Sequence, residues 1–181
     1  MFGRAWKRII AVGIASCVAL LSTTALAAPS TPAGGTVAVA SLESGVLADI
    51  NSLRRSHGLA QLRLSPALGA AARQHSESMA AKGYFAHESA DGSSFWRRVR
   101  GFYTSKKFGF WSVGENLLWS SPDIDADGAL QMWMNSPPHR ANLLTARWRE
   151  VGISAVHVVG AQGVYGGNDV TIVTADFGVR H

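Results

Sequence analysis

Apolar residues recur at helical spacing in the first half of the chain, and they predict two long helices. The first runs from near Ser41 to His57-Gly58. In the second, Ser65 caps a helix with Pro66 at its first position, where proline is favoured, and the sequence AKGY ends it. The apolar faces consist of Val46, Leu47, Ile50 and Leu53 in the first helix and Leu68, Ala72, His75 and Met79 in the second.

The middle of the chain predicts two shorter helices separated by an irregular segment. The stretch SFWRRVRGF predicts a short third helix, and residues 101–114 are irregular, aromatic and glycine-bearing. Ser121-Pro122 opens a fourth helix, and Pro137-Pro138 ends it because proline lacks the N–H that a helix interior needs. The apolar face of this fourth helix includes Leu130, Trp133 and Met134.

Past residue 149 the pattern changes from helical spacing to alternation. The stretch EVGISAVHVV alternates over Val151, Ile153 and Ala155, which predicts a half-buried strand. The stretch GAQGVYGGND supplies turns, and VTIVTADFG predicts a second strand rich in β-branched residues. Helices therefore come first and strands later, as in a single α+β domain rather than in a series of βαβ units.

The N-terminus has the pattern of a secretory signal peptide. Basic residues precede the nearly all-apolar stretch 9–21, and the small residues of ALA at 25–27 predict cleavage after Ala27. The apolar stretch is shorter than the ~20 residues that a membrane span needs. We therefore expect a signal peptide (1–27), a flexible leader rich in Pro, Gly and Thr (28–40), and a domain (41–181) that is secreted or periplasmic, with no transmembrane span in the mature form.

Cys17 offers an alternative to simple secretion. The sequence IASC resembles the lipobox of a bacterial lipoprotein, in which the cysteine becomes the lipidated first residue, although the apolar run continues past it. Cleavage after Ala27 would instead leave a mature protein without cysteine and without disulfides. It would also remove Arg4, Lys7 and Arg8 and lower the formal charge from +5 to +2. An exported protein of this charge is not expected to bind nucleic acid.

Candidate chemistry centres on two histidines and one glutamate. His87 and His139 both follow predicted helices, in segments with their own turn residues, where functional side chains concentrate. Glu115 lies between a glycine and an apolar run, so we expect it to be drawn inward and to need a partner. His75 shares the apolar face of its helix and is expected to be a hydrogen-bonded core residue. The cluster RRVR (97–100) is expected to be a solvated helix face or a contact with anionic envelope polymers.

Four motifs, in order, resemble the bacterial branch of the CAP superfamily (cysteine-rich secretory protein, antigen 5 and pathogenesis-related 1), also called the SCP-like domain. They are FAHESADGS, GENLLW, MWMNSPPHRANLL and EVGI, and the resemblance extends from about residue 47 to 178. It implies an α-β-α sandwich, with an antiparallel sheet between helices. It also implies a central cleft with two histidines and two acidic residues, which in some relatives bind a divalent metal such as zinc.

Carried over by position, the resemblance places His87, Glu115 and His139 in this cleft, as catalytic residues if the protein is an enzyme and as the candidate metal ligands. Ser136, a candidate for ligand binding, stands where animal and plant relatives have a second glutamate. Glu150 either replaces that glutamate in the cleft or is a solvated residue at a strand edge. Trp119 is a further candidate for ligand binding. With Phe108, Phe110 and Trp111, it would form core, cleft wall or a platform for sugar rings or lipid.

Three functions remain open from the sequence. The first is a secreted or periplasmic CAP-domain protein whose His/Glu-lined cleft binds an envelope or extracellular ligand, such as peptidoglycan, a peptide or a lipid, with Zn²⁺ or another divalent cation as an optional cofactor. The second is a metal-assisted hydrolase of peptide or glycan bonds in the envelope, because a bound metal would activate water. The third is a lipid-binding module. A serine hydrolase is not expected, since no serine has a nucleophile-elbow context.

Overall fold

The computed structural model describes residues 35–181, which form an α+β domain with a central sheet. The signal peptide and Cys17 lie outside the described residues. The strands are β1 (Thr36–Ala38), β2 (Arg63–Leu64), β3 (Trp111–Ser120), β4 (Glu150–Ala161) and β5 (Asn168–Arg180). The helices are α1 (Ala40–Ser56), α2 (Pro66–Lys82), α3 (Phe95–Phe102), α4 (Ala126–Asn135) and α5 (Pro137–Leu143), and a short 3₁₀ helix, η1, spans Gly163–Tyr165.

The sheet has the strand order β1-β4-β5-β3, and the short strand β2 also pairs with β4. The pairing is antiparallel except between β2 and β4, which are parallel. Strands β4 and β5 form the long central hairpin, and β3 lies at one edge of the sheet. This topology matters for the site, because an edge strand can be approached from both faces of the sheet and from its open side.

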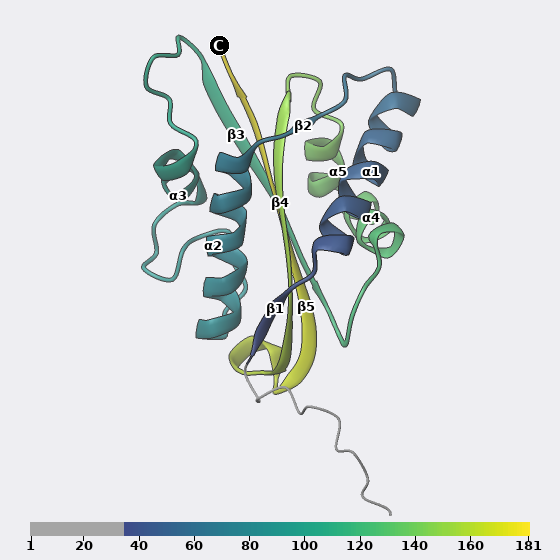
Figure 1. The fold of residues 1–181 in the computed structure, drawn as a ribbon, viewed down its shortest axis with the longest axis vertical. Coiled ribbons are helices and arrows are strands. Elements are labelled where there is room, and N and C mark those ends of the chain that lie inside the picture. The colour runs from purple at the N-terminus through teal and green to yellow at the C-terminus, as the bar shows by residue number, and fades with distance from the viewer. Residues whose placement is uncertain (1–34) are drawn as a thin grey trace, which may run out of the picture. The chain divides into compact units, whose positions relative to one another are not determined.

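Helices cover both faces of the sheet, so the predicted three-layer arrangement is confirmed. Figure 1 views the sheet edge-on, with α2 and α3 on one side and α1, α4 and α5 on the other. Alternation along the central strand β5 supplies both layers: Val173, Ala175 and Phe177 belong to the cluster under α1, α4 and α5, whereas Ile172 belongs to the cluster under α2. A buried core on each face is what holds three layers together without disulfides.

Helix α2 lies unusually close to the sheet. Its start follows from sequence, because the Ser65 side chain accepts a hydrogen bond from the Leu68 N–H and Pro66 occupies the first turn. Further along, a Cβ added at Gly152 of β4 would lie 2.0 Å from the Gly69 nitrogen and 2.1 Å from the Leu68 carbonyl carbon. Helix and strand therefore contact each other backbone to backbone, and only glycine fits at this position.

Four sequence-based expectations differ from the structure. Residues 36–38 of the expected leader form β1, which pairs with β4. The expected irregular segment 101–114 ends earlier, where β3 begins at Trp111. Helix α4 begins after Asp125, whose side chain accepts a hydrogen bond from the Gly128 N–H, and not at Ser121-Pro122. Pro137 and Pro138 end α4 but also begin α5, because proline is acceptable in a first helical turn.

No helix within residues 35–181 has both the length and the apolar character that crossing a membrane requires.

Candidate functional site

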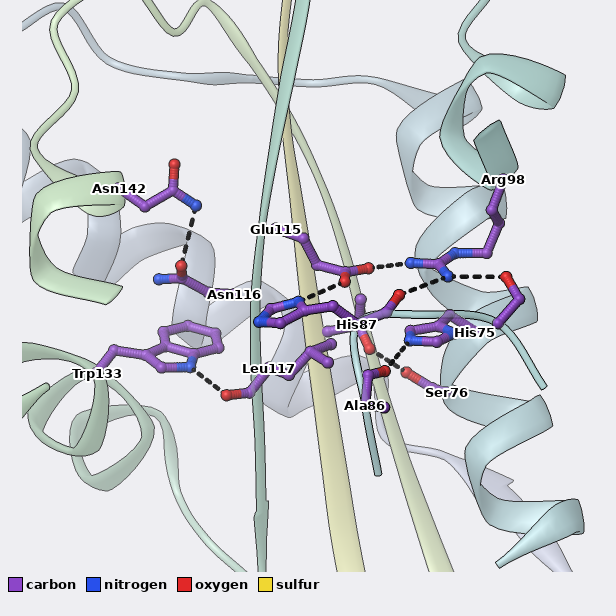
Figure 2. Close-up of polar contacts among 12 residues, drawn as sticks. His75, Ser76, Ala86, His87, Arg98, Glu115, Asn116, Leu117, Trp133 and Asn142 are labelled. Atoms are coloured by element: carbon purple, nitrogen blue, oxygen red, sulfur yellow. Dashed lines mark hydrogen bonds and ion pairs between the residues drawn. The ribbon is translucent and has the colours of Figure 1, made fainter. Parts of the chain in front are cut away.

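The candidate site is built on the edge strand β3, which carries the GENLLW motif. Successive side chains of a strand point to opposite faces. Glu115 therefore points to the side of α2 and α3, where it contacts Arg98 and His87. The next residue, Asn116, points to the other side, where it contacts α5. One short motif thus connects the two helical layers at a single point of the sheet (Figure 2).

Glu115 is buried between a cation and an imidazole. One carboxylate oxygen, Oε1, lies 2.8 Å from Nδ1 of His87, and the other, Oε2, accepts a hydrogen bond from the Arg98 guanidinium. The side chains of Glu115 and Arg98 are only 1% and 4% exposed, whereas that of His87 is 47% exposed. The pair formed by His87 and Glu115 was predicted, and the structure brings the two residues together. Its arrangement places a half-exposed imidazole on a buried, charged support (Figure 2).

The segment that carries His87 is held by its own backbone. It follows α2, which ends at Gly83 in the left-handed conformation (φ 66°) that glycine adopts readily. The Ala86 carbonyl lies 2.8 Å from Nε2 of His75, and the His87 carbonyl accepts a hydrogen bond from Arg98 at 3.2 Å. His75 is buried and hydrogen-bonded, as expected for a core histidine. The backbone and the ring of His87 are therefore both held in place by contacts within the protein.

His139 reaches the site from the opposite layer. It lies in α5, not in a loop, and its carbonyl accepts a hydrogen bond from the Asn116 side chain at 3.1 Å. Asn142 in turn donates to Asn116 at 2.9 Å, and the Trp148 indole donates to Asn142. A Cβ at Gly114 would lie 2.6 Å from Asn142, so the glycine of the GEN motif is needed for this close approach. The polar residues of the two motifs thus fix α5 against β3.

The two histidines have opposite electrostatic environments. The hydrogen bond that Glu115 accepts from His87, together with the charge of Glu115, raises the pKa of His87 above its usual value of about 6.5, despite partial burial. Burial lowers the pKa of His139, and the charge of His87 lowers it further. The positive charge is therefore favoured on His87 and disfavoured on His139.

A second buried carboxyl group, Asp176, was missed by the sequence analysis. It lies on β5 directly opposite Glu115 and is fully buried. Neither of its oxygens has a hydrogen-bond partner within the described residues. Burial raises its pKa well above the usual value, and the neighbouring Glu115 raises it further. The raised pKa favours the neutral form of Asp176, which limits the negative charge buried at this point of the sheet.

Replacing Asp176 with Asn should change how stability depends on pH. The pKa of Asp176 is higher in the folded state than in the unfolded state. The contribution of Asp176 to wild-type stability is therefore fully present below its unfolded pKa of about 3.9, and it falls as the pH rises towards its folded pKa. The loss is at most about 1.4 kcal/mol per pH unit. Urea denaturation from pH 4 to 8 should show Asp176→Asn gaining stability relative to wild type as pH rises. The exposed control Asp123→Asn should run parallel to wild type, and a parallel Asp176→Asn curve would contradict the assignment.

Arg98 is the other functional residue that the sequence analysis misassigned. The cluster RRVR was expected to be a solvated helix face, but Arg98 is buried and only its neighbours Arg97 and Arg100 are exposed. A signal was present: Arg98 and Val99 follow Phe95 at i+3 and i+4, so Arg98 lies on the apolar face of its helix. An arginine in such a position needs a carboxylate partner, which Glu115 provides.

The remaining candidate residues are not brought to the His87–Glu115 pair by contacts in the structure. Ser136 is the residue between α4 and α5, and its side chain makes no cap hydrogen bond to α5. Trp119 packs edge-to-face on Tyr165, with ring centroids 5.4 Å apart. Glu150 accepts a hydrogen bond from Tyr103, whose ring packs on β5 at Gly178. Of the other aromatic candidates, Phe108 and Phe110 are exposed and Trp111 is partly buried.

The donor atoms present fit a metal ion only in part. Within residues 35–181, no three His, Cys, Asp or Glu side chains are grouped so that they could share a metal ion. Both oxygens of Glu115 are already engaged, one of them by the positive charge of Arg98. The free ring nitrogen of His87 and the ring of His139 would then be the protein ligands. Catalytic zinc sites usually have three protein ligands.

Comparison with known proteins agrees with this architecture. An outer surface protein of Borrelia burgdorferi aligns with a TM-score of 0.63 over 82% of this chain and 99% of its own, at 19% identity, which supports the fold. An extracellular protein containing an SCP domain from Bacillus anthracis aligns with a TM-score of 0.55 at 28% identity, over 75% of this chain and 40% of its own.

Sequence comparison finds relatives in Bacillus subtilis. The protein YkwD is 30% identical over 118 residues, which is 65% of this chain and 44% of YkwD. The membrane protein YlbC is 31% identical over 111 residues, which is 61% of this chain and 30% of YlbC. The chain thus matches less than half the length of either relative. The family model described as "CAP: Cysteine-rich secretory protein family" matches residues 47–177, most of the described domain, so the chain belongs to the CAP family.

Proposed function

We propose that this CAP-domain protein acts outside the cytoplasm, where the cleft formed by His87, Glu115 and His139 binds a ligand of the cell envelope or the extracellular medium. The site of action is supported by the outer-surface and extracellular relatives, and by an N-terminal sequence typical of a signal peptide. Peptidoglycan and peptides are the ligand classes that suit the cleft, because their many carbonyl and hydroxyl oxygens accept hydrogen bonds.

One observation carries the proposal. Two buried charged groups, Glu115 and Arg98, support a third group, His87, that is half-exposed. Burying an ion pair gains little stability over apolar packing. The best explanation for the buried pair of Glu115 and Arg98 is therefore that it holds the His87 imidazole in a fixed position. Because the carboxylate can only accept, His87 donates its Nδ1 proton to Glu115, and its Nε2 is left for a ligand.

Co-sedimentation with purified peptidoglycan tests the proposal. His87→Ala and His139→Ala should each weaken binding by roughly tenfold, the loss expected when a hydrogen bond to a charged or buried group is removed. His57→Ala is the matched control, because His57 is exposed and contacts only its own helix. Binding should also weaken as pH rises above the raised pKa of His87, since its positive charge is then lost. Equal binding by all three variants would contradict a role for the cleft.

A divalent metal at the same histidines is the second candidate. It is favoured by the His87–Glu115 hydrogen bond, since metal-bound histidines usually donate their other N–H to a carboxylate. Isothermal titration of Zn²⁺ should then give a 1:1 complex that is lost in both His87→Ala and His139→Ala and weakens at low pH, where protons compete. Absence of binding, or binding that survives both changes, would remove the metal. The hydrolase alternative further requires metal-dependent release of peptidoglycan fragments.

A further inference from the structure

A pocket of about 410 Å³ lies at the end of the sheet where β2, β4 and β5 meet. It plays no part in the cleft described above. Its notable feature is charge: four of its side chains are arginines, and one is a carboxylate. These residues are Arg63, Arg147, Arg149, Arg180 and Glu150.

The strand register gathers the arginines from distant parts of the sequence. Arg63 on β2 lies opposite Glu150 on β4, and Glu150 lies opposite Gly178 on β5, two residues before Arg180. The backbone N–H of Arg63 also donates to the Arg149 carbonyl at 3.0 Å. Because three strands converge here, the fold itself brings the positive charges together.

The protein balances these charges only in part. Within the described residues the only ion pairs involve Glu115, so none of the four arginines has a carboxylate partner. Glu150, the one acidic side chain of the pocket, accepts a hydrogen bond from Tyr103, and the main-chain carboxylate of His181, which also lines the pocket, adds a second negative charge. Four arginines against these two carboxylates leave the pocket with two excess positive charges. Excess positive charge concentrated in one pocket favours the binding of an anionic ligand.

Two of the guanidinium groups are already held in place. Arg180 lies over the rings of Tyr103 and Phe108, at 3.9 and 4.7 Å, and donates to the Thr104 carbonyl. Arg149 donates to the carbonyls of Ala146 and Trp148 at 2.8 and 2.9 Å. An arginine fixed in advance loses less conformational entropy when it binds an anion.

We propose that this arginine pocket binds a phosphate-bearing ligand that carries at least two negative charges. Guanidinium groups pair with both carboxylate and phosphate oxygens through two parallel hydrogen bonds. A single carboxylate would neutralise only one of the two excess charges, whereas a phosphate monoester or a run of phosphodiesters neutralises both. The ligand is therefore an anionic phosphate group, either free, on a polymer or on a lipid.

The arginine pocket is separate from the histidine cleft, and the proposal does not depend on the cleft's function. Tyr103 packs on Gly178, which lies on β5 between Asp176 of the cleft and Arg180 of the pocket. Glu150, on the pocket side of that ring, faces the arginines rather than His87. An experiment that disproves ligand binding at one site therefore leaves the proposal for the other site unchanged.

Isothermal titration of the protein with inorganic tripolyphosphate at low salt tests the proposal. We expect 1:1 binding that weakens roughly tenfold or more in Arg63→Ala and in Arg147→Ala, and that falls as salt is added. Neither side chain makes a hydrogen bond within the described residues, so both variants should fold, which thermal melting checks. Arg63→Lys should restore part of the affinity. Arg100→Ala, an exposed arginine on α3, is the matched control.

Either of two results would overturn the proposal: no binding of tripolyphosphate by wild type, or an equal loss in Arg100→Ala, which would indicate diffuse attraction. A parallel arm identifies the source of the phosphate. Flotation with phosphatidylglycerol vesicles, against phosphatidylcholine vesicles, should depend on Arg63 and Arg147 if the phosphate belongs to a lipid. If the vesicles do not bind while tripolyphosphate does, the ligand is a free or polymeric phosphate.

Discussion

Replacing Arg98 with Met is expected to lower the free energy of unfolding by about 3–5 kcal/mol, the usual effect of removing one member of a buried ion pair. The Glu115 carboxylate, which is 1% exposed, would lose the guanidinium that compensates its charge. Arg98 also donates to the His87 carbonyl and the Ser89 hydroxyl, so the loop that carries His87 would lose two further contacts. Urea denaturation at pH 7 measures the effect.

A second substitution in the same ion pair distinguishes the effect of the lost charge from the effect of the lost packing. Adding Glu115→Gln to Arg98→Met removes the uncompensated charge, so the double variant should recover part of the lost stability. Arg100→Met, two residues away on the exposed face of α3, should stay within about 0.5 kcal/mol of wild type. If Arg98→Met behaves like Arg100→Met, Glu115 does not depend on Arg98 and the electrostatic account of the site is wrong.

Gly152→Ala is the second change that we expect to be strongly destabilising. It should lower the free energy of unfolding by about 3 kcal/mol or more, which is at or beyond the upper end of the usual effect of overpacking a core. The added methyl group would overlap the backbone of α2 at Leu68 and Gly69, with distances of 2.0 to 2.6 Å. Backbone atoms cannot rotate away as a side chain can, so α2 would have to move off the sheet. Thermal and urea denaturation would both report the loss.

Gly69→Ala is the matched control for that contact, because it lies on the α2 side of the same interface. A Cβ at Gly69 would meet nothing within 4 Å, and alanine favours a helix over glycine by about 0.5–1 kcal/mol. Gly69→Ala should therefore be as stable as wild type or slightly more so. Equal stability of the two variants would show that helix and strand are not in backbone contact.

The sequence predicted the helical layers well because their signals are local. Apolar spacing and the Ser65-Pro66 start located α1 and α2 within a few residues of their observed ends. The alternation in β4 and the β-branched run in β5 located the central hairpin. Each of these signals lies within a single helix or strand, so none of them required knowledge of the tertiary contacts.

The site was predictable only where a motif marked it. His87 and Glu115 were paired through the family resemblance, whereas Arg98 and Asp176 were not found, because their roles depend on contacts between elements far apart in sequence. Two adjacent prolines suggested a loop at His139, but proline also suits the first turn of a helix, and α5 begins there. The arginine pocket likewise results from strand register, which no single segment encodes.

Glu115 orients His87 and favours its positive charge, and titration of the histidines by NMR measures this directly. In the wild-type protein the pKa of His87 should lie above about 6.5 and that of His139 below it. In Glu115→Gln the pKa of His87 should fall, because the carboxylate that stabilises its positive charge is gone. A wild-type His87 that titrates at or below its usual value, and does not change in Glu115→Gln, would contradict the account.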